Sequence, residues 1–287
     1  MSKTNLILAG SGYLGDTIID MMNSGKHNYS IIEIARTRKK RSNDVMSVQF
    51  DIDQDYADLE YLENSKIIYM APPDTSSLSD IRITKFLKLI DQKSINRFVY
   101  ISTSGVYGDC KGKIVTEENA IKPKTDRARR RADAESQVLK YSNHNNSLAI
   151  VLRVPGIYGK DRLPLKRIMN REPLITHDDS RVTNLIHVED LSRIVIKSLD
   201  INIQKDEVIN VSDGNPIKTT KYYEIIYEIL GKDLPDYITY EDAKRLYDEK
   251  RLSFLNESRV LDTKKMNKLM PGCIRYQDIR KGIRRSL

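Results

Sequence analysis

The run Leu-Ile-Leu-Ala-Gly-Ser-Gly-Tyr-Leu-Gly occupies residues 6–15 and decides the fold of this chain. It starts as an apolar strand and enters the spacing G-x-G-x-x-G, whose glycines are Gly10, Gly12 and Gly15. A helical pattern follows over residues 13–23, so the motif lies between a predicted strand and a predicted helix. In that setting Gly10 permits a tight turn, Gly12 leaves room for a pyrophosphate, and Gly15 lets the helix approach the strand. The alternative is a glycine-rich turn that binds no ligand.

Composition limits the class of protein. The chain has 287 residues, of which 39% are hydrophobic, and a net charge of +8. No segment approaches the roughly 20 apolar residues of a membrane span, and the early first strand leaves no room for a signal peptide. The two cysteines, Cys110 and Cys273, form no metal-binding spacing, and the four histidines are scattered. We therefore expect a cytoplasmic protein with no metal centre and no contact with a membrane.

Short apolar runs alternate with helical patterns, which is typical of βαβ units and a parallel sheet. We expect strands at residues 4–9, 29–35, 45–50, 66–70, 97–102, 147–152 and 207–211. Helices are expected at residues 13–23, 78–93, 125–142, 189–199, 219–231 and 264–270. The predicted fold class is α/β, a Rossmann-type doubly wound parallel sheet with a small C-terminal substrate-cap subdomain. Residues 1–155 would form the dinucleotide-binding domain, with its sheet completed near 184–212, and residues 156–183 and 213–287 would form the cap.

Basic residues follow the second predicted strand, which ends at Ala35. In this fold that strand end lies beside the adenosine ribose, where an acidic residue would hold the 2′-hydroxyl of NAD. Here the next residues include Arg36 and Arg38, and the planar arginine fork suits a 2′-phosphate. The pattern favours NADP over NAD, with a solvated basic loop as the alternative.

Two further loops leave the carboxyl edge of the predicted sheet, which is the ligand side of open α/β folds. Asp51 and Ile52 follow the third strand, and Ala71 and Pro72 follow the fourth. A proline cannot extend a strand, so it would fix a rigid wall beside the adenosine. The alternative is that these residues only end their strands and form an ordinary loop.

Four later segments have a recognisable order. Residues 98–109 read F-V-Y-I-S-T-S-G-V-Y-G-D, and residues 152–159 read L-R-V-P-G-I-Y-G. Residues 184–191 read N-L-I-H-V-E-D-L, and residues 209–213 read I-N-V-S-D. With the glycine motif, these segments resemble the extended short-chain dehydrogenase/reductase superfamily, which includes the nucleotide-sugar epimerases and dehydratases. The resemblance covers nearly the whole chain and implies its fold more firmly than its substrate.

The resemblance also implies a catalytic set of a Ser or Thr hydroxyl, a Tyr and a Lys. Thr103 matches the hydroxyl position. Aligned on Pro123 and Glu135, the chain has Arg127 in place of the Tyr and Arg131 in place of the Lys. Arginine cannot donate a proton near neutral pH. This departure indicates an atypical branch of the superfamily, in which Arg131 would hold the nicotinamide ribose or a phosphate.

The predicted site follows from these motifs. Thr103 would orient the substrate oxygen, and Tyr107 is one candidate for the missing acid, with packing as its alternative role. Asp80, Tyr158 and Arg181 are the predicted substrate residues, and Asp80 could equally be an ordinary residue at a helix start. The predicted dinucleotide-binding residues are Gly10, Gly12, Tyr13, Leu14, Gly15, Arg36, Arg38, Asp51, Ile52, Ala71, Pro72 and Arg131.

The sequence thus predicts an NADP-binding oxidoreductase, or an enzyme similar to nucleotide-sugar epimerases and dehydratases, that acts on a small phosphorylated or sugar-nucleotide substrate. Loss of both the Tyr and the Lys supports a different class, a non-catalytic NADP-binding redox sensor or assembly factor. The basic clusters lie in no recognisable nucleic-acid module, so no nucleic-acid partner is expected. Because the predicted helix 125–142 begins with several arginines and few apolar residues, we expect a monomer or a weak homodimer.

Overall fold

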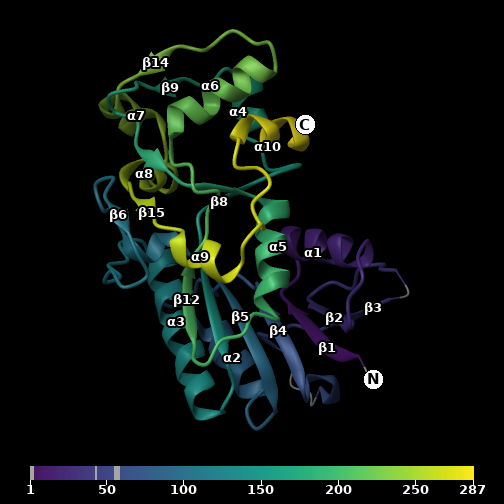
Figure 1. Cartoon of the computed structure of the whole chain (residues 1–287). Helices are drawn as coiled ribbons and strands as arrows, with labels where there is room; N and C mark the ends of the chain where they lie inside the picture. The colour runs from purple at the N-terminus through teal and green to yellow at the C-terminus, as the bar shows by residue number, and fades with distance from the viewer. Residues whose placement is uncertain (1–2, 43, 55–58) are drawn as a thin grey trace.

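The computed structural model describes residues 3–42, 44–54 and 59–287. A seven-stranded sheet lies at its centre, with all strands parallel and in the order β12-β7-β5-β4-β1-β2-β3. Strand β1 lies between β2 and β4, so the strand order reverses there, as in a doubly wound sheet (Figure 1). The predicted fold class is confirmed. The strands are β1 (Thr4–Ala9), β2 (Tyr29–Ala35), β3 (Val45–Gln49), β4 (Ser65–Tyr69), β5 (Ile95–Thr103), β7 (Ala149–Val154) and β12 (Glu207–Asn210).

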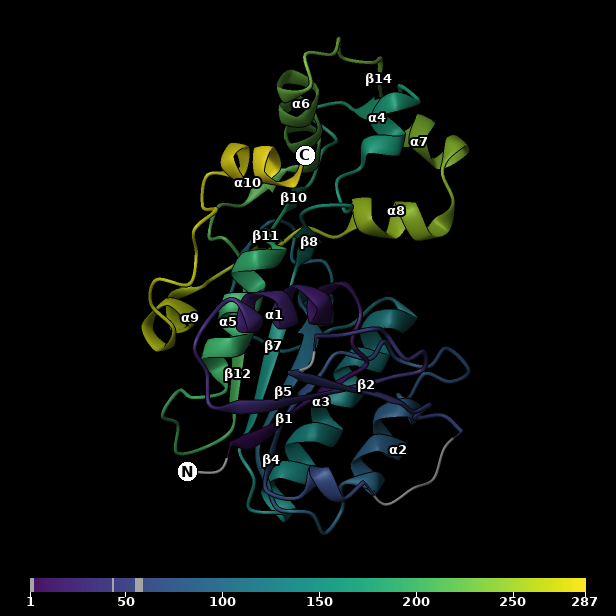
Figure 2. The same cartoon turned by 90° about the vertical axis from the view of Figure 1, so that its right-hand side faces the viewer.

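Helices cover both faces of the sheet (Figure 2). Helices α1 (Tyr13–Asn23) and α5 (Val188–Ser198) pack on one face, and α2 (Ile81–Leu89) and α3 (Asp126–His144) pack on the other. Side chains alternate along a strand, so β1 contributes to two cores. Leu6 and Leu8 lie in the core with α1 and α5, whereas Ile7 and Ala9 lie in the core with α2 and α3. Because both faces are covered, consecutive residues of a strand are buried, as the run from Leu6 to Ala9 is in β1.

A smaller layer sits over the carboxyl end of the sheet, at the top of Figure 1. Its core contains Tyr158, Tyr222, Ile226 and Ile283. Helix η1 (Glu60–Leu62) belongs to the sheet domain, where it contacts β1. The elements of the cap and its connections are η2 (Ser104–Tyr107), β6 (Ile114–Val115), β8 (Gly156–Tyr158), α4 (Leu165–Met169), β9 (Leu174–Ile175), β10 (Val182–Thr183), β11 (Leu185–His187), β13 (Ile217–Lys218), α6 (Thr219–Ile229), β14 (Tyr237–Ile238), α7 (Tyr240–Leu246), α8 (Glu249–Asn256), β15 (Val260–Leu261), α9 (Lys264–Leu269) and α10 (Ile279–Ser286). Within the predicted cap segment 213–287, α9 instead packs beside β12 and places Met266 in the core of the sheet.

Every helix in the described residues is too short or too polar to cross a bilayer.

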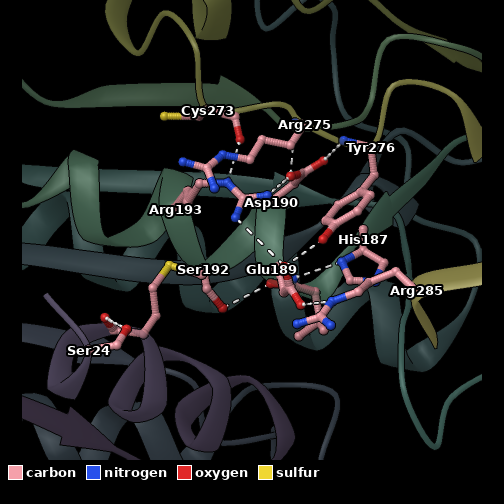
Figure 3. A network of polar contacts seen from close by, with 12 residues as sticks. Ser24, His187, Glu189, Asp190, Ser192, Arg193, Cys273, Arg275, Tyr276 and Arg285 are labelled. Atoms are coloured by element: carbon pink, nitrogen blue, oxygen red, sulfur yellow. Dashed lines mark hydrogen bonds and ion pairs between the residues drawn. The ribbon is translucent and has the colours of Figure 1, made fainter. Parts of the chain in front are cut away.

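A buried carboxylate fastens the C-terminal segment to the sheet domain (Figure 3). Asp190 of α5 is fully buried and accepts hydrogen bonds from the backbone N–H groups of Arg275 (3.0 Å) and Tyr276 (2.9 Å). Its charge is balanced by the guanidinium of Arg193. The hydroxyl of Tyr276 donates to Glu189 at 2.8 Å. The motif at residues 184–191 therefore serves to hold the chain that returns to the cap.

A second buried acid makes stability depend on pH. Asp213 is 3% exposed, and burial raises its pKa to about 7. Since an unfolded Asp titrates near 3.9, the folded state holds an extra proton between those two values. Stability therefore falls as the pH rises from about 4 to 7, and the cost is fully present above pH 7, at up to about 4 kcal/mol.

We expect Asp213→Asn to be more stable than the native protein at pH 8 and equal to it near pH 4. In the native protein the N–H of Asn215 donates a hydrogen bond to the Asp213 carboxylate at 2.9 Å. The asparagine side chain keeps an oxygen that can accept this bond, but unlike the carboxylate it never ionises. Thermal melts of both proteins across this pH range measure the difference. The same difference at both pH values would contradict the assignment.

Candidate active site

Seven of the predicted dinucleotide residues line one cavity of about 230 Å³ at the carboxyl edge of the sheet. It lies where β1, β2, β3 and β4 end, since its walls come from the loops that follow each of these strands. A parallel sheet brings these loops together, although they lie far apart in the sequence. The seven residues are Gly10, Gly12, Arg36, Asp51, Ile52, Ala71 and Pro72.

The three glycines differ in what surrounds them. A Cβ on Gly10 would lie 2.5 Å from Ala71, and its φ of +75° is a conformation that favours glycine. A Cβ on Gly15 would lie 2.2 Å from the hydroxyl of Ser11. A Cβ on Gly12 would meet no atom within 4 Å. Gly10 and Gly15 are therefore required by the packing of the fold, whereas Gly12 borders open space at the N-terminus of α1, where free N–H groups favour an anion.

Tyr13 and Leu14, the other predicted residues of this turn, turn away from the cavity. Leu14 packs in the core between α1 and the sheet. The ring of Tyr13 lies beneath the guanidinium of Arg162, which is 4.8 Å from the ring centroid. Tyr13 therefore contacts Arg162, which lines a second cavity that also contains Thr103.

The end of β2 is strongly basic. Arg36 lines the cavity formed where β1, β2, β3 and β4 end, and Arg38 lines a separate hollow with Lys39, Lys40 and Arg41. Glu33 lies within β2 and is fully buried, and its carboxylate is bound by Arg41. The acid nearest the end of β2 is thus already neutralised, and Arg36 occupies the position beside the cavity.

Arg82 also lines this cavity, although no sequence motif indicated it. It is the second residue of α2, and its guanidinium binds the carboxylate of Asp53 and the carbonyl oxygen of Pro72. Its Nε lies 2.9 Å from Asp53 Oδ1. Arg82 therefore holds the loops after β3 and β4 together beside the cavity.

A second and larger cavity, of about 480 Å³, contains Thr103; we call it the Thr103 cavity. Thr103 ends β5, and its hydroxyl accepts the N–H of Gly105 at 3.2 Å, which leaves its own proton free to donate. Three guanidinium groups and one carboxylate also face this cavity. The lining residues are Thr103, Ser104, Gly105, Thr125, Arg127, Pro155, Gly156, Ile157, Arg162, Val182, Thr183, Asn184, Glu257 and Arg259.

The two arginines that replace the Tyr and the Lys take different positions. Arg127 is an exposed residue that lines the Thr103 cavity. Arg131 lies between the ends of β4 and β5, where its Nη1 donates to the carbonyl oxygen of Ile101 at 3.0 Å and to the hydroxyl of Tyr100 at 3.1 Å. The predicted contact of Arg131 with a dinucleotide stays a prediction.

The geometry argues against Tyr107 as the missing acid. It is 2% exposed and packs with Val106 beneath the cavity. Its hydroxyl donates to Asn210 at 2.7 Å and accepts from Arg153 at 2.9 Å, so its hydrogen bonds are already made. Burial raises the pKa of Tyr107, whereas an acid–base tyrosine needs a lowered one. The packing role is the one that the contacts support.

Two of the three predicted substrate residues are also buried away from the cavity. Asp80 is fully buried and caps α2, where its carboxylate accepts the N–H of Ile83 at 3.1 Å. Tyr158 is 1% exposed and packs against His187 and Tyr222 in the cap. Neither side chain reaches the solvent, which supports the alternative role of Asp80 at a helix start and a packing role for Tyr158. Contact of either residue with a substrate stays a prediction. Arg181 is exposed and directly precedes β10, which lines the Thr103 cavity, so its role stays a prediction.

A third cavity, of about 230 Å³, lies within the cap and has Thr183 in common with the Thr103 cavity. Four tyrosines contribute to its walls, namely Tyr222, Tyr223, Tyr227 and Tyr247. The guanidinium of Arg251 lies over the ring of Tyr247 at 3.3 Å from its centroid. Such a pocket is suited to a flat ring. We call it the tyrosine pocket.

Comparison with known proteins agrees with this geometry. The NAD dependent epimerase/dehydratase family matches residues 6–212. A protein of Methanocaldococcus jannaschii provisionally named as a UDP-glucose 4-epimerase is 22% identical over 256 residues, which are 79% of this chain and 82% of that protein.

Two solved structures share the whole fold. A protein of unknown function from Silicibacter pomeroyi DSS has a TM-score of 0.82 at 22% identity, over 98% of this chain and 97% of its own. The UDP-glucuronic acid 4-epimerase of Bacillus cereus, solved with UDP-glucuronic acid and NAD, has a TM-score of 0.79 at 15% identity, over 99% of this chain and 98% of its own.

Proposed function

The chain belongs to the NAD dependent epimerase/dehydratase family, and from that premise we propose that it is an oxidoreductase-type enzyme acting on a nucleotide sugar. The observation that carries the proposal is that the tyrosine pocket and the Thr103 cavity are neighbours, since Thr183 lines both of them. A nucleotide sugar has a flat base, a charged diphosphate and a polar sugar, in that order. The tyrosine pocket would take the base, and the Thr103 cavity would take the charged and polar parts.

We propose that a nicotinamide dinucleotide occupies the first cavity, with its pyrophosphate over Gly12. The fit rests on the open space beside Gly12 and on the N-terminus of α1, whose N–H groups would bind the phosphates. When bound, the nicotinamide supplies hydride transfer to or from the substrate. Thr103 would then donate its hydroxyl proton to the substrate oxygen and orient it.

The proton relay of the family would be altered in this chain. Among the described residues that line the Thr103 cavity, Glu257 is the one carboxylic acid, and none is Tyr, His, Lys or Cys. One Glu257 oxygen binds the guanidinium of Arg259. Since general acid–base catalysis typically contributes about 10²- to 10⁴-fold, we expect turnover to be slow compared with enzymes that keep the tyrosine.

The form of the dinucleotide is a separate proposal. The Bacillus cereus enzyme binds NAD, which argues for NAD, whereas the arginines after β2 argue for NADP. Because Arg36 stands where an acid would select NAD, we propose NADP. Two charge-assisted contacts of roughly 1.5–3 kcal/mol each would make NADPH bind at least about tenfold more tightly than NADH.

Calorimetric titration of NADPH and NADH measures this preference. We expect Arg36→Ala, and more so its combination with Arg38→Ala, to remove the preference without weakening NADH. Lys26→Ala, an exposed cation in another loop, is the matched control and should leave both affinities unchanged. Equal affinities in the native protein would contradict the proposal and leave NAD as the cofactor.

Product analysis tests the enzymatic function itself. The purified protein is incubated with either dinucleotide and UDP-glucose, UDP-glucuronic acid or UDP-N-acetylglucosamine, and the sugars are separated by chromatography and mass. We expect an epimer or a keto product from at least one sugar, and about 10²-fold less from Thr103→Ala. Tight dinucleotide binding without any product would favour the redox sensor or assembly factor instead.

A further inference from the structure

The loop between β8 and α4 reaches back to the start of α1. The N–H of Arg162 donates to the carbonyl oxygen of Gly159 at 3.0 Å, which closes a turn. This turn fits tightly against the sheet domain, since a Cβ on Gly159 would lie 2.4 Å from the hydroxyl oxygen of Tyr13 and 2.7 Å from the side chain of Val188. Leu163, which follows the turn, is buried in the core of the cap. The loop is therefore held from both sides.

Arg162 connects the Thr103 cavity with the glycine-rich turn. The residue lines the Thr103 cavity. Its guanidinium also lies over the ring of Tyr13, with Cζ 4.8 Å from the ring centroid. Tyr13 directly follows Gly12, which lines the cavity at the ends of β1, β2, β3 and β4 and borders open space at the N-terminus of α1. The guanidinium therefore lies beside the turn proposed to hold the pyrophosphate as well as beside the cavity proposed to hold the substrate.

The guanidinium of Arg162 is not paired within the protein. Arg162 is exposed, and among the described residues none forms an ion pair with it or accepts a hydrogen bond from its guanidinium. By contrast, Arg259 in the same cavity is paired with Glu257. Stacking on a ring leaves the N–H groups in the guanidinium plane free, and these groups match the oxygens of a phosphate. Arg162 is therefore available to an anionic ligand.

Two diphosphates bound in neighbouring sites repel each other, and a cation between them offsets the repulsion. We propose that Arg162 is a counter-charge shared by the pyrophosphate of the dinucleotide and the diphosphate of the nucleotide sugar, so that each ligand strengthens the binding of the other. Such coupling is reciprocal, because the factor by which one ligand raises the affinity of the second also applies in the reverse direction. This inference rests on the proposed dinucleotide and nucleotide-sugar sites.

Calorimetric titration of the full-length protein with UDP tests the coupling, once without a dinucleotide and once with saturating NADPH or NADH. We expect UDP to bind at least about fivefold more tightly when the better-binding dinucleotide is present, which is within the usual range of coupling between two sites. Arg162→Gln should reduce this factor to one or below. Lys160→Gln removes an exposed cation two residues away in the same loop and should keep the native factor. Arg162→Lys keeps the charge without the planar fork and should retain part of the coupling.

The other outcomes separate the inference from the proposed function. Independent binding of UDP and the dinucleotide to the native protein, or coupling that survives in Arg162→Gln, overturns the inference and leaves both proposed sites standing. An equal loss of UDP affinity in Arg162→Gln with and without the dinucleotide places the arginine on the nucleotide sugar alone, which also overturns it. Failure of UDP to bind either form of the native protein removes the nucleotide-sugar function and the inference together. Circular dichroism shows whether the variants are folded, and a merely structural role of Arg162 would weaken each ligand without changing the coupling factor.

Discussion

Replacing Gly12 with valine should abolish dinucleotide binding and leave the fold intact. A Cβ at this position meets no protein atom within 4 Å, so the new side chain has room in the free protein. The same space lies over the N-terminus of α1, where the pyrophosphate would sit. Losing even one charge-assisted hydrogen bond to a phosphate removes roughly 1.5–3 kcal/mol, and a steric block removes several such bonds. We therefore expect affinity to fall by at least about 100-fold in calorimetry.

Gly10→Ala is the matched control for Gly12→Val. Its Cβ would lie 2.5 Å from Ala71, at a φ of +75° that alanine rarely adopts. We expect this smaller change to lower the free energy of unfolding by about 1–3 kcal/mol, whereas Gly12→Val should change it by less than about 0.5 kcal/mol. Dinucleotide binding by Gly12→Val at native affinity would show that the cavity is not the cofactor site.

Removing the carboxylate of Glu135 should have the largest effect on stability. Glu135 of α3 and Arg153 of β7 form an ion pair at 2.7 Å, and their exposed fractions are 3% and 6%. Glu135 also accepts a hydrogen bond from Ser102 at 2.5 Å, and Arg153 donates to Tyr107. Glu135→Ala leaves a buried guanidinium without its counter-charge, which costs about 3–5 kcal/mol. Urea unfolding measures this loss.

Two further variants separate burial of the charge from loss of packing. Glu135→Leu combined with Arg153→Met removes both charges and keeps apolar volume, so it should be clearly more stable than Glu135→Ala. Glu118→Ala, at an exposed position, should be near neutral. If the double variant is as unstable as Glu135→Ala, the effect comes from packing rather than from the unpaired charge.

Most of the sheet domain could be predicted because its elements are long and strongly patterned. Strands β1 and β2 and helix α1 begin and end at the predicted residues, and the other predicted strands are shifted by one to two residues. The strands of the cap could not be predicted, because β8, β9 and β10 have only two or three residues each. That is too few for an alternation of apolar and polar residues to be visible. Those short strands are fixed by long-range contacts, such as the pairing of β8 with β11.

The same contrast between strong local patterns and long-range contacts explains which residues of the site could be predicted. The residues of the cavity proposed to bind the dinucleotide could be predicted from the strand ends, because parallel strands bring their carboxyl ends to one edge. The burial of Tyr107 and Tyr158 could not be predicted, because a motif gives the position of a side chain along the chain but not whether it faces solvent. Arg162 and Glu257 were missed because each reaches the Thr103 cavity from a cap loop with no local pattern.

A crystal structure of the protein with a bound nicotinamide dinucleotide tests the central claim most directly. We expect the adenosine between Asp51 and Ala71, the pyrophosphate over Gly12, and the nicotinamide ring beside the hydroxyl of Thr103. A dinucleotide bound elsewhere, or one whose nicotinamide points away from Thr103, would contradict it.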